Sequence, residues 1–249
     1  MTVSGAPGND QQCRIYERFA QNGSGDDPIR PGGLQLTERA LSECRFSPGA
    51  TLLDVGCGRG ATVKYVRDLH GLQALGVDLS SALLGAGIEE HGDLPLLRAS
   101  GEHLPFAPRT FDGILAECSL SVMANPSNAI KDFHRVLKRE GLLAVTDLYA
   151  RLPEGLSDLR RLPMTCCLTG AFSREDLTAE LTDVGFSLVL WEDHSHALKH
   201  FAAQLILSCG SLQQFWRQTG PAALDVEQLN NAVATAKPGY FLLIARKKD

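Results

Sequence analysis

The sequence predicts an α/β protein built on a doubly wound, seven-stranded, mostly parallel sheet, with a helical insertion before the last strand. Short apolar runs alternate with longer helix-like stretches, which is typical of βαβ units. The runs at 114–116 and 142–145 are apolar at every position, as expected for strands covered on both faces. A glycine-rich turn at 56–60 follows the first apolar run. With 249 residues, one large core is feasible.

Seven stretches are predicted as strands because each is short, apolar and bounded by turn residues. They span residues 51–55, 73–77, 94–98, 111–116, 142–148, 188–191 and 240–246.

The chain divides into four predicted segments. Residues 1–35 are expected to form an amino-terminal helix and a flexible loop, since 23–33 is rich in glycine and proline. Residues 36–193 form the core, and residues 239–249 form its last strand. Residues 194–238 are expected to insert two helices, broken around Gly210 and again at Gly220 and Pro221, that act as a lid or an interface.

Composition excludes several classes of protein. Hydrophobic residues make up 44% and charged residues 21%, which excludes a disordered or fibrous chain. The net charge is -5, and the longest run of like charges is residues 246–248, so no nucleic-acid partner is expected. No apolar run approaches the roughly 20 residues of a membrane span. The first thirty residues lack a secretory apolar region, which predicts a cytoplasmic location.

The seven cysteines contain no Cys-x-x-Cys pair, so neither a disulfide framework nor a zinc site is expected. His194, His196 and His200 form a cluster, but we interpret it as a solvated helix start. The sequence therefore predicts free thiols and no resident metal.

The glycine-rich turn lies in residues 53–61, which read LDVGCGRGA. Glycine is required where a turn takes left-handed dihedral angles and the backbone must touch a ligand. Gly56, Gly58 and Ala61 also satisfy the dinucleotide fingerprint, and Asp78 lies 78 − 56 = 22 residues on, where that fingerprint places an acid. An NAD-dependent oxidoreductase is therefore one alternative.

Asp54 argues against that alternative. Its carboxylate would repel a pyrophosphate by roughly 4 kcal/mol at 4 Å and an effective dielectric of 20. The same charge attracts the amino group and sulfonium of S-adenosylmethionine. Together with Asp78 and Glu117, also at strand ends, Asp54 predicts an acidic pocket at the switch point of the sheet.

From about residue 51 to 186, and again in the last strand, the chain resembles class I S-adenosylmethionine-dependent methyltransferases of type 11, which are Rossmann-like. The family motif Asp-Ala-Glu-x-Leu-Pro-Phe appears at 100–106 as SGEHLPF, and FDGILA at 111–116 and FHRVLK at 133–138 also match. Ser100 replaces the expected aspartate, and a hydroxyl accepts a hydrogen bond from adenine more weakly. The resemblance implies S-adenosylmethionine as cofactor, bound by Tyr16 of a closing amino-terminal helix and by Asp54, Gly56, Cys57, Gly58, Gly60, Asp78, Leu79, Ser100, Gly101, Glu102 and Glu117.

The segments ECSL at 117–120, TDLY at 146–149 and CLTGAF at 167–172 resemble the arsenite methyltransferase branch in the same order. This resemblance implies that Cys118 and Cys167 bind trivalent arsenic as thiolates. Two departures are GSG at 23–25, where the branch has Gly-Cys-Gly, and the doublet of Cys166 and Cys167. Cys118, Cys167 and Glu117 are the predicted catalytic residues, and Glu117 or Asp147 is the predicted general base for an oxygen acceptor.

The expected function is S-adenosylmethionine-dependent methylation of a small molecule, with a thiol-bound metalloid such as arsenite as one acceptor. The alternatives are the NAD-dependent oxidoreductase and a non-catalytic cofactor-binding protein. The expected partners are a small-molecule substrate and a second copy of the chain in a homodimer, with neither nucleic acid nor membrane.

Overall fold

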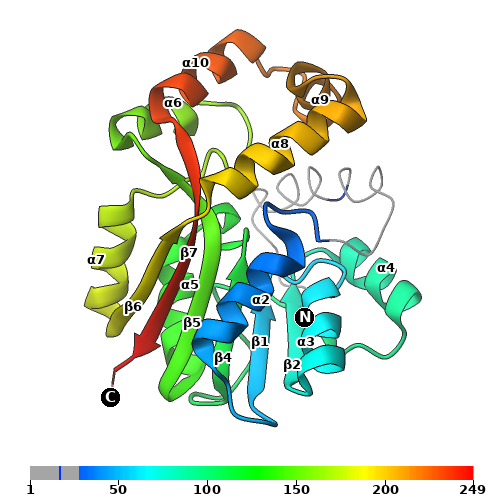
Figure 1. Ribbon diagram of the computed structural model, residues 1–249, viewed down its shortest axis with the longest axis vertical. Helices are drawn as coiled ribbons and strands as arrows, with labels where there is room; N and C mark the ends of the chain where they lie inside the picture. Colours follow the sequence, from blue (N-terminus) through cyan, green and yellow to red (C-terminus); the bar gives the residue numbers. More distant parts are fainter. Residues whose placement is uncertain (1–16, 18–27, 249) are drawn as a thin grey trace, which may run out of the picture.

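The computed structural model describes residue 17 and residues 28–248 (Figure 1). Its centre is one seven-stranded sheet with the order β3-β2-β1-β4-β5-β7-β6. β7 is antiparallel to both of its neighbours, and the other paired strands are parallel. The predicted fold class is therefore confirmed. The strands are β1 (Thr51–Val55), β2 (Gln73–Asp78), β3 (Leu96–Arg98), β4 (Phe111–Glu117), β5 (Leu137–Ala150), β6 (Phe186–Asp193) and β7 (Pro238–Lys247).

Only β1 has its predicted bounds. β2, β4, β6 and β7 are longer by one or two residues at one or both ends, and the starts of β5 and β3 differ for reasons of local sequence. β5 begins at Leu137, which pairs with Phe111, and the polar residues 138–140 interrupt the apolar pattern that marks the rest of the strand. β3 begins at Leu96 rather than at Leu94. Pro95 has no amide hydrogen to donate to a neighbouring strand, which shortens the ladder.

Helices cover both faces of the sheet. α2 (Gly33–Cys44), α3 (Ala61–His70) and α4 (Ser81–His91) pack on one face, and α5 (Pro126–Val136) and α7 (Arg174–Val184) pack on the other (Figure 1). Local chemistry fixes several helix starts: the hydroxyls of Ser80 and Ser173 accept hydrogen bonds from amides in the first turns of α4 and α7.

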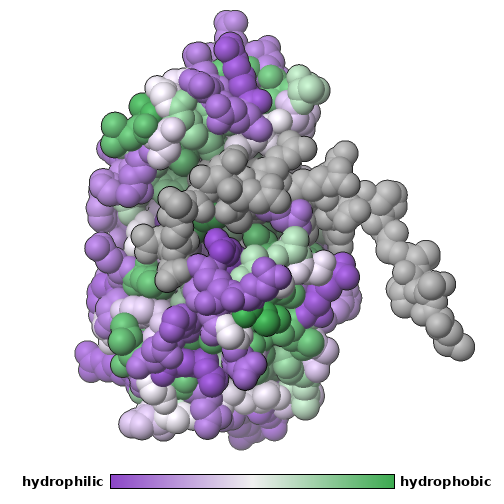
Figure 2. Space-filling model, turned by 90° about the vertical axis from the view of Figure 1, so that its right-hand side faces the viewer, coloured by the Kyte–Doolittle hydropathy of each residue, from purple (hydrophilic) through white to green (hydrophobic). Residues whose placement is uncertain are grey.

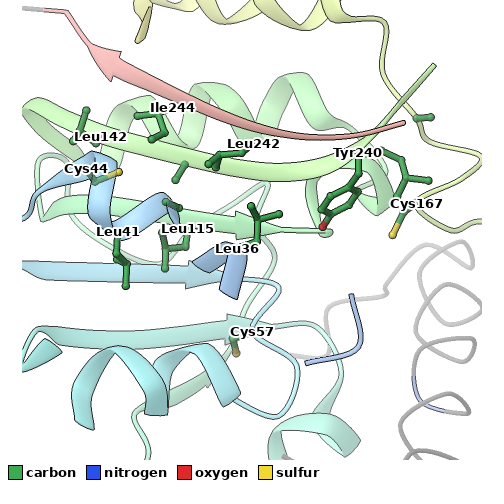
Figure 3. Packing of buried hydrophobic residues seen from close by; sticks show 14 of the residues in the cluster. Leu36, Leu41, Cys44, Cys57, Leu115, Leu142, Cys167, Tyr240, Leu242 and Ile244 are labelled. Atoms are coloured by element: carbon green, nitrogen blue, oxygen red, sulfur yellow. The ribbon is translucent and has the colours of Figure 1, made fainter. Parts of the chain in front are cut away.

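The sheet separates two hydrophobic cores, one on each face, and the last strand contributes side chains to both. Tyr240, Leu242 and Ile244 belong to the core under α2 and α3, whereas Phe241 and Leu243 belong to the core under α5 and α7. Alternate residues of a strand point to opposite faces, so an apolar run fills both cores. In Figure 3, side chains of α2 lie over the strands, while Tyr240 and Cys167 lie at one end of the sheet. In the same way, Leu115 and Leu142 lie in the first core, and Ile114 and Leu143 in the second, so the prediction that β4 and β5 are buried on both faces is confirmed.

The insertion contains three helices where two were predicted: α8 (Ser195–Cys209), α9 (Leu212–Thr219) and α10 (Val226–Ala236). The helices break at Gly210 and at Gly220 and Pro221, as predicted. The third forms because the Asp225 carboxylate accepts hydrogen bonds from two amides at the start of α10. α10 packs on α6 (Leu156–Arg160), which follows η2 (Pro153–Gly155), and these helices lie above the carboxyl ends of the parallel strands (Figure 1).

The boundary predicted at residue 36 is wrong for the described part of the amino-terminal segment. α2 starts at Gly33 and Pro31 is buried, so residues 28–35 pack with the core rather than forming a flexible loop. None of the helices described is both long and apolar enough to cross a membrane.

Candidate active site

The glycine turn connects β1 to α3. The amides of Gly56 and Cys57 donate to the carbonyl oxygen of Val77, at 2.8 and 3.1 Å, which closes the turn onto β2. Gly56, Gly58 and Gly60 all have positive φ, at 79, 55 and 84°. A Cβ at Gly56 would lie 2.3 Å from the Cβ of Ser119, whereas a Cβ at Gly58 would meet nothing within 4 Å. Gly56 is therefore required by packing, and Gly58 presents open backbone.

Asp78 lies at the end of β2, directly beside this turn. Its two carboxylate oxygens accept hydrogen bonds from the amides of Gly58 and Ser80, both at 2.8 Å. Burial raises the pKa of Asp78, although these amides lower it in part. The carbonyl of neighbouring Leu79 accepts from the Arg98 side chain. Each oxygen of Asp78 keeps lone pairs for a further donor.

Asp54 and Glu117, the other two acids of the predicted pocket, are both buried. Burial raises the pKa of Asp54 well above its usual value, the charge of Glu117 raises it further, and Arg30 opposes the rise.

The surroundings of Glu117 differ from the prediction of a general base. Arg30 Nη2 donates to its carboxylate at 2.7 Å, and the hydroxyls of Thr37 and Thr62 donate at 2.8 and 2.9 Å. Glu117 is therefore the anion of a buried ion pair rather than an open base. Arg30 escaped prediction because it lies 87 residues before Glu117, in a stretch interpreted as loop.

The turn at 100–102 is held by its own polar groups. The Glu102 carboxylate accepts from the amide of Asn125, the N-cap of α5, and the Ser100 hydroxyl accepts from the amide of Glu102. A Cβ at Gly101 would lie 2.7 Å from Met123 Cε. Glu102 therefore has a structural partner that the motif did not indicate. The predicted cofactor residue Tyr16 lies outside the described residues.

The structure brings Cys118 and Cys167 together. Their Sγ atoms are 2.8 Å apart, at the end of β4 and in the segment that follows β5. No disulfide joins the described cysteines. Cys118 has a φ of 56°, uncommon for a residue with a side chain, and its amide donates to Thr146. Cys166 is buried elsewhere, beside Thr169, so Cys167 is the member of the doublet that meets Cys118.

Asp147 is the third potential ligand at this thiol pair. Ligand atoms of Cys118, Cys167 and Asp147 lie within 4.8 Å of one another. Asp147 is fully buried, and burial raises its pKa to about 6. Its oxygens accept from the hydroxyl and amide of Ser121 at 2.6 and 2.9 Å, and from the amide of Leu148 at 2.8 Å.

In the described part of the chain, the histidines of the insertion make no comparable group. His194 pairs instead with the carboxylate of Glu192, 2.9 Å away.

Comparison with known proteins decides the family. A family model for a methyltransferase domain matches residues 53–145. O-methyltransferase resE of Aspergillus sclerotiorum is 28% identical over 94% of this chain and 89% of its own length. O-methyltransferase rstn1 of Aspergillus nomiae is 30% identical over 72% of this chain and 85% of its own length. The chain belongs to the S-adenosylmethionine-dependent methyltransferases.

Solved structures agree with this assignment. The [4+2]-cyclase SpnF is similar to this methyltransferase over 100% of the chain and 98% of the cyclase, with a TM-score of 0.75 and 25% identity. Phosphoethanolamine N-methyltransferase 2 of Haemonchus contortus, solved with S-adenosylmethionine, shares the fold over 98% of this chain and 59% of its own, with a TM-score of 0.67 and 17% identity. The cofactor of this methyltransferase is S-adenosylmethionine, so the NAD-dependent alternative is set aside.

Proposed function

We propose that this methyltransferase methylates a small molecule bound between the cofactor and the thiol pair of Cys118 and Cys167. The observation that carries the proposal is the 2.8 Å approach of the two Sγ atoms. Acceptors in open α/β sheets bind outside the carboxyl ends of the strands, where these loops lie.

The described residues of the glycine turn fit the cofactor. Gly58 offers open backbone, and Asp78 offers acceptors for two ribose hydroxyls. The buried carboxylates of Asp54 and Glu117 suit a ligand with an ammonium and a sulfonium group. When bound, the sulfonium supplies an electrophilic methyl group. We assign the turn at 100–102 and Tyr16 to the same site on the family resemblance.

Both predicted bases are already engaged. Glu117 is paired with Arg30, and donors hold both oxygens of Asp147. An acceptor that carries its own nucleophilic lone pair needs no base, and alignment of acceptor, methyl carbon and leaving sulfur can lower the barrier by roughly 7–11 kcal/mol. This favours a soft acceptor over an alcohol.

Trivalent arsenic is the acceptor that suits the thiol pair best. Soft thiolates are appropriate ligands for a soft metalloid, whose remaining lone pair is the nucleophile. The hydrogen bond with Cys167 and burial raise the pKa of Cys118, so metalloid binding has to displace a proton from that sulfur.

A hydroxyl of a small organic molecule is the second candidate acceptor. Two similar Aspergillus proteins are O-methyltransferases by name. The raised pKa of Asp147, about 6, would also suit a general base near neutral pH.

Arsenite titration by calorimetry separates the two candidates. We expect the wild type to bind arsenite and to yield methylated arsenic with S-adenosylmethionine. Cys118→Ser/Cys167→Ser should lose arsenite binding yet still bind S-adenosylhomocysteine, because hydroxyls are poor ligands for a soft centre. Cys166→Ser is the matched control, since its sulfur packs away from the pair. Equal arsenite binding by the wild type and the double variant, or none by the wild type, would exclude the metalloid and leave the hydroxyl acceptor.

We further propose that the insertion of residues 194–238 covers the acceptor site or pairs two copies of the chain. It lies above the carboxyl ends of the strands (Figure 1). Leu207 of α8 is 86% exposed, and Ile206 beside it is also exposed. Figure 2 shows hydrophilic and hydrophobic residues intermixed on the face that it presents.

A further inference from the structure

Arg30 is a buried cation paired with Glu117, one of the acids of the proposed cofactor site. Only 9% of its side chain is exposed. Its Nη2 donates to Thr37 on α2, to Thr62 in the first turn of α3 and to Glu117 at the end of β4, at 2.7, 3.0 and 2.7 Å. The guanidinium is therefore fixed beside the helix that follows the glycine turn.

The Nε–H group of this guanidinium has no hydrogen-bond partner in the described part of the chain. Among the described residues, the side-chain hydrogen bonds of Arg30 all come from Nη2, and Nε is buried without a partner. A buried donor without an acceptor costs about 1–3 kcal/mol of desolvation, more for a charged group. An ion pair with Glu117 alone explains Nη2 but leaves Nε unexplained. The orphaned N–H points to an acceptor that binds there.

The charges of the site indicate what that acceptor is. S-adenosylmethionine carries an ammonium, a sulfonium and one carboxylate. Asp54, Asp78 and Glu117 suit its two cations but repel its carboxylate. The positive charge of Arg30 reaches this region, because it opposes the rise in the pKa of Asp54. A guanidinium presents donors in a planar fork that matches a carboxylate.

We propose that Arg30 binds the carboxylate of the methionine half of S-adenosylmethionine through Nε, while its Nη2 stays paired with Glu117. The inference rests on the proposed cofactor site and is independent of the acceptor. Arg30 thereby makes the site selective for cofactors that keep the carboxyl group.

Binding of two ligands without any acceptor tests this selectivity. S-adenosylhomocysteine and its decarboxylated analogue, S-adenosyl-3-thiopropylamine, differ only in the carboxyl group. By calorimetry, we expect the wild type to prefer S-adenosylhomocysteine by about 10- to 100-fold, the range of one hydrogen bond between charged groups. A wild type that binds both ligands equally would overturn the proposal without any variant.

A variant that removes Arg30 should also remove the charge of Glu117, because an unpaired buried charge would destabilise the fold by itself. Arg30→Met/Glu117→Gln removes both ions of the pair. Both ligands lose the carboxylate proposed for their ammonium group, but only S-adenosylhomocysteine also loses the partner of its carboxylate, so we expect the preference of this variant to fall below about threefold. Arg30→Lys keeps the charge without Nε and should retain part of the preference if the double variant does not fold. A full wild-type preference in either variant would contradict the role of Nε.

Arg59→Met is the matched control. Arg59 is another arginine of the glycine turn with a buried, unpartnered Nε, but its guanidinium pairs with Glu90 of α4. We expect this variant to keep the wild-type preference. A purely structural effect of losing an arginine would instead weaken both ligands by the same factor, and an unchanged preference in the Arg30 variants would count against the proposal.

Discussion

At the residue scale, the Asp78 carboxylate shapes the glycine turn by accepting from the amides of Gly58 and Ser80. It keeps lone pairs for a further donor, and we propose that this donor is the ribose of the cofactor. Asp78→Ala is expected to weaken S-adenosylhomocysteine binding by about 10- to 100-fold, measured by calorimetry. Asp68→Ala is the control, since Asp68 is an exposed residue of neighbouring α3. Equal losses in both variants would argue against the assignment.

Asp147 gives a pH-dependent prediction at the same scale. Burial raises its pKa from 3.8 to about 6, so between these values the folded state holds a proton that the unfolded state has released. Its contribution to the free energy of unfolding is therefore full below about pH 4 and falls as the pH rises through 6, by up to ~3 kcal/mol.

Asp147→Asn removes that titration. Its free energy of unfolding should be lower than that of the wild type at pH 4, because hydrogen bonds from Ser121 or Leu148 are lost. The difference should shrink between pH 4 and 7. Urea unfolding across this range measures it, and a difference that stays constant with pH would show that the carboxyl group titrates normally.

At the element scale, a close backbone contact between Gly170 and Ser121 sets the position of the thiol pair. A Cβ at Gly170 would lie 1.8 Å from the carbonyl oxygen of Ser121, in η1 (Leu120–Val122). Gly170→Ala should therefore push the segment carrying Cys167 away from Cys118. We expect oxidation of the pair to a disulfide by diamide to slow by about tenfold, since a disulfide requires close Cβ atoms.

Gly85→Ala on α4 is the control for this substitution. A Cβ there meets nothing within 4 Å, so the change should leave the thiols alone and stabilise the helix by about 0.5–1 kcal/mol. Unchanged oxidation kinetics in Gly170→Ala would mean that the segment accommodates the methyl group without moving Cys167.

At the scale of the whole molecule, the insertion can be removed because β6 and β7 are antiparallel neighbours. Asp193 pairs with Phe241, so Asn-Gly in place of residues 194–237 leaves a five-residue loop, which includes residues 238–240, to close the hairpin. Leu156 and Leu159 of α6 would no longer be covered by Leu229 of α10, and this exposure lowers the free energy of unfolding. We expect S-adenosylhomocysteine affinity within about threefold of the wild type but loss of turnover or of a dimer.

Leu207→Glu separates the two proposed roles of the insertion. If α8 forms a subunit interface, a charge at this exposed position should yield monomers in sedimentation experiments without loss of cofactor binding. If the insertion is a lid alone, the variant should keep its oligomeric state. A deletion variant that is monomeric like the wild type and fully active would refute both roles.

The sequence by itself determined the fold class and, through the family resemblance, the cofactor. Strand apolarity, glycine spacing and the position of Asp78 are local patterns, and they specify βαβ units whose strand ends meet at one edge. The family resemblance also marked Cys118 and Cys167, which the structure places in contact. The start of β5 escaped prediction because exposed polar residues at 138–140 break the apolar pattern there.

Only the tertiary structure decided the pairings at that edge. Arg30 meets Glu117, Cys167 rather than Cys166 meets Cys118, and Glu102 binds the amide of Asn125. Each pairing joins segments that are far apart in the sequence or depends on which way one side chain of a doublet points. Periodicity carries no information about either, because loop conformations at the end of a sheet are set by long-range packing such as the contact of Gly170 with Ser121.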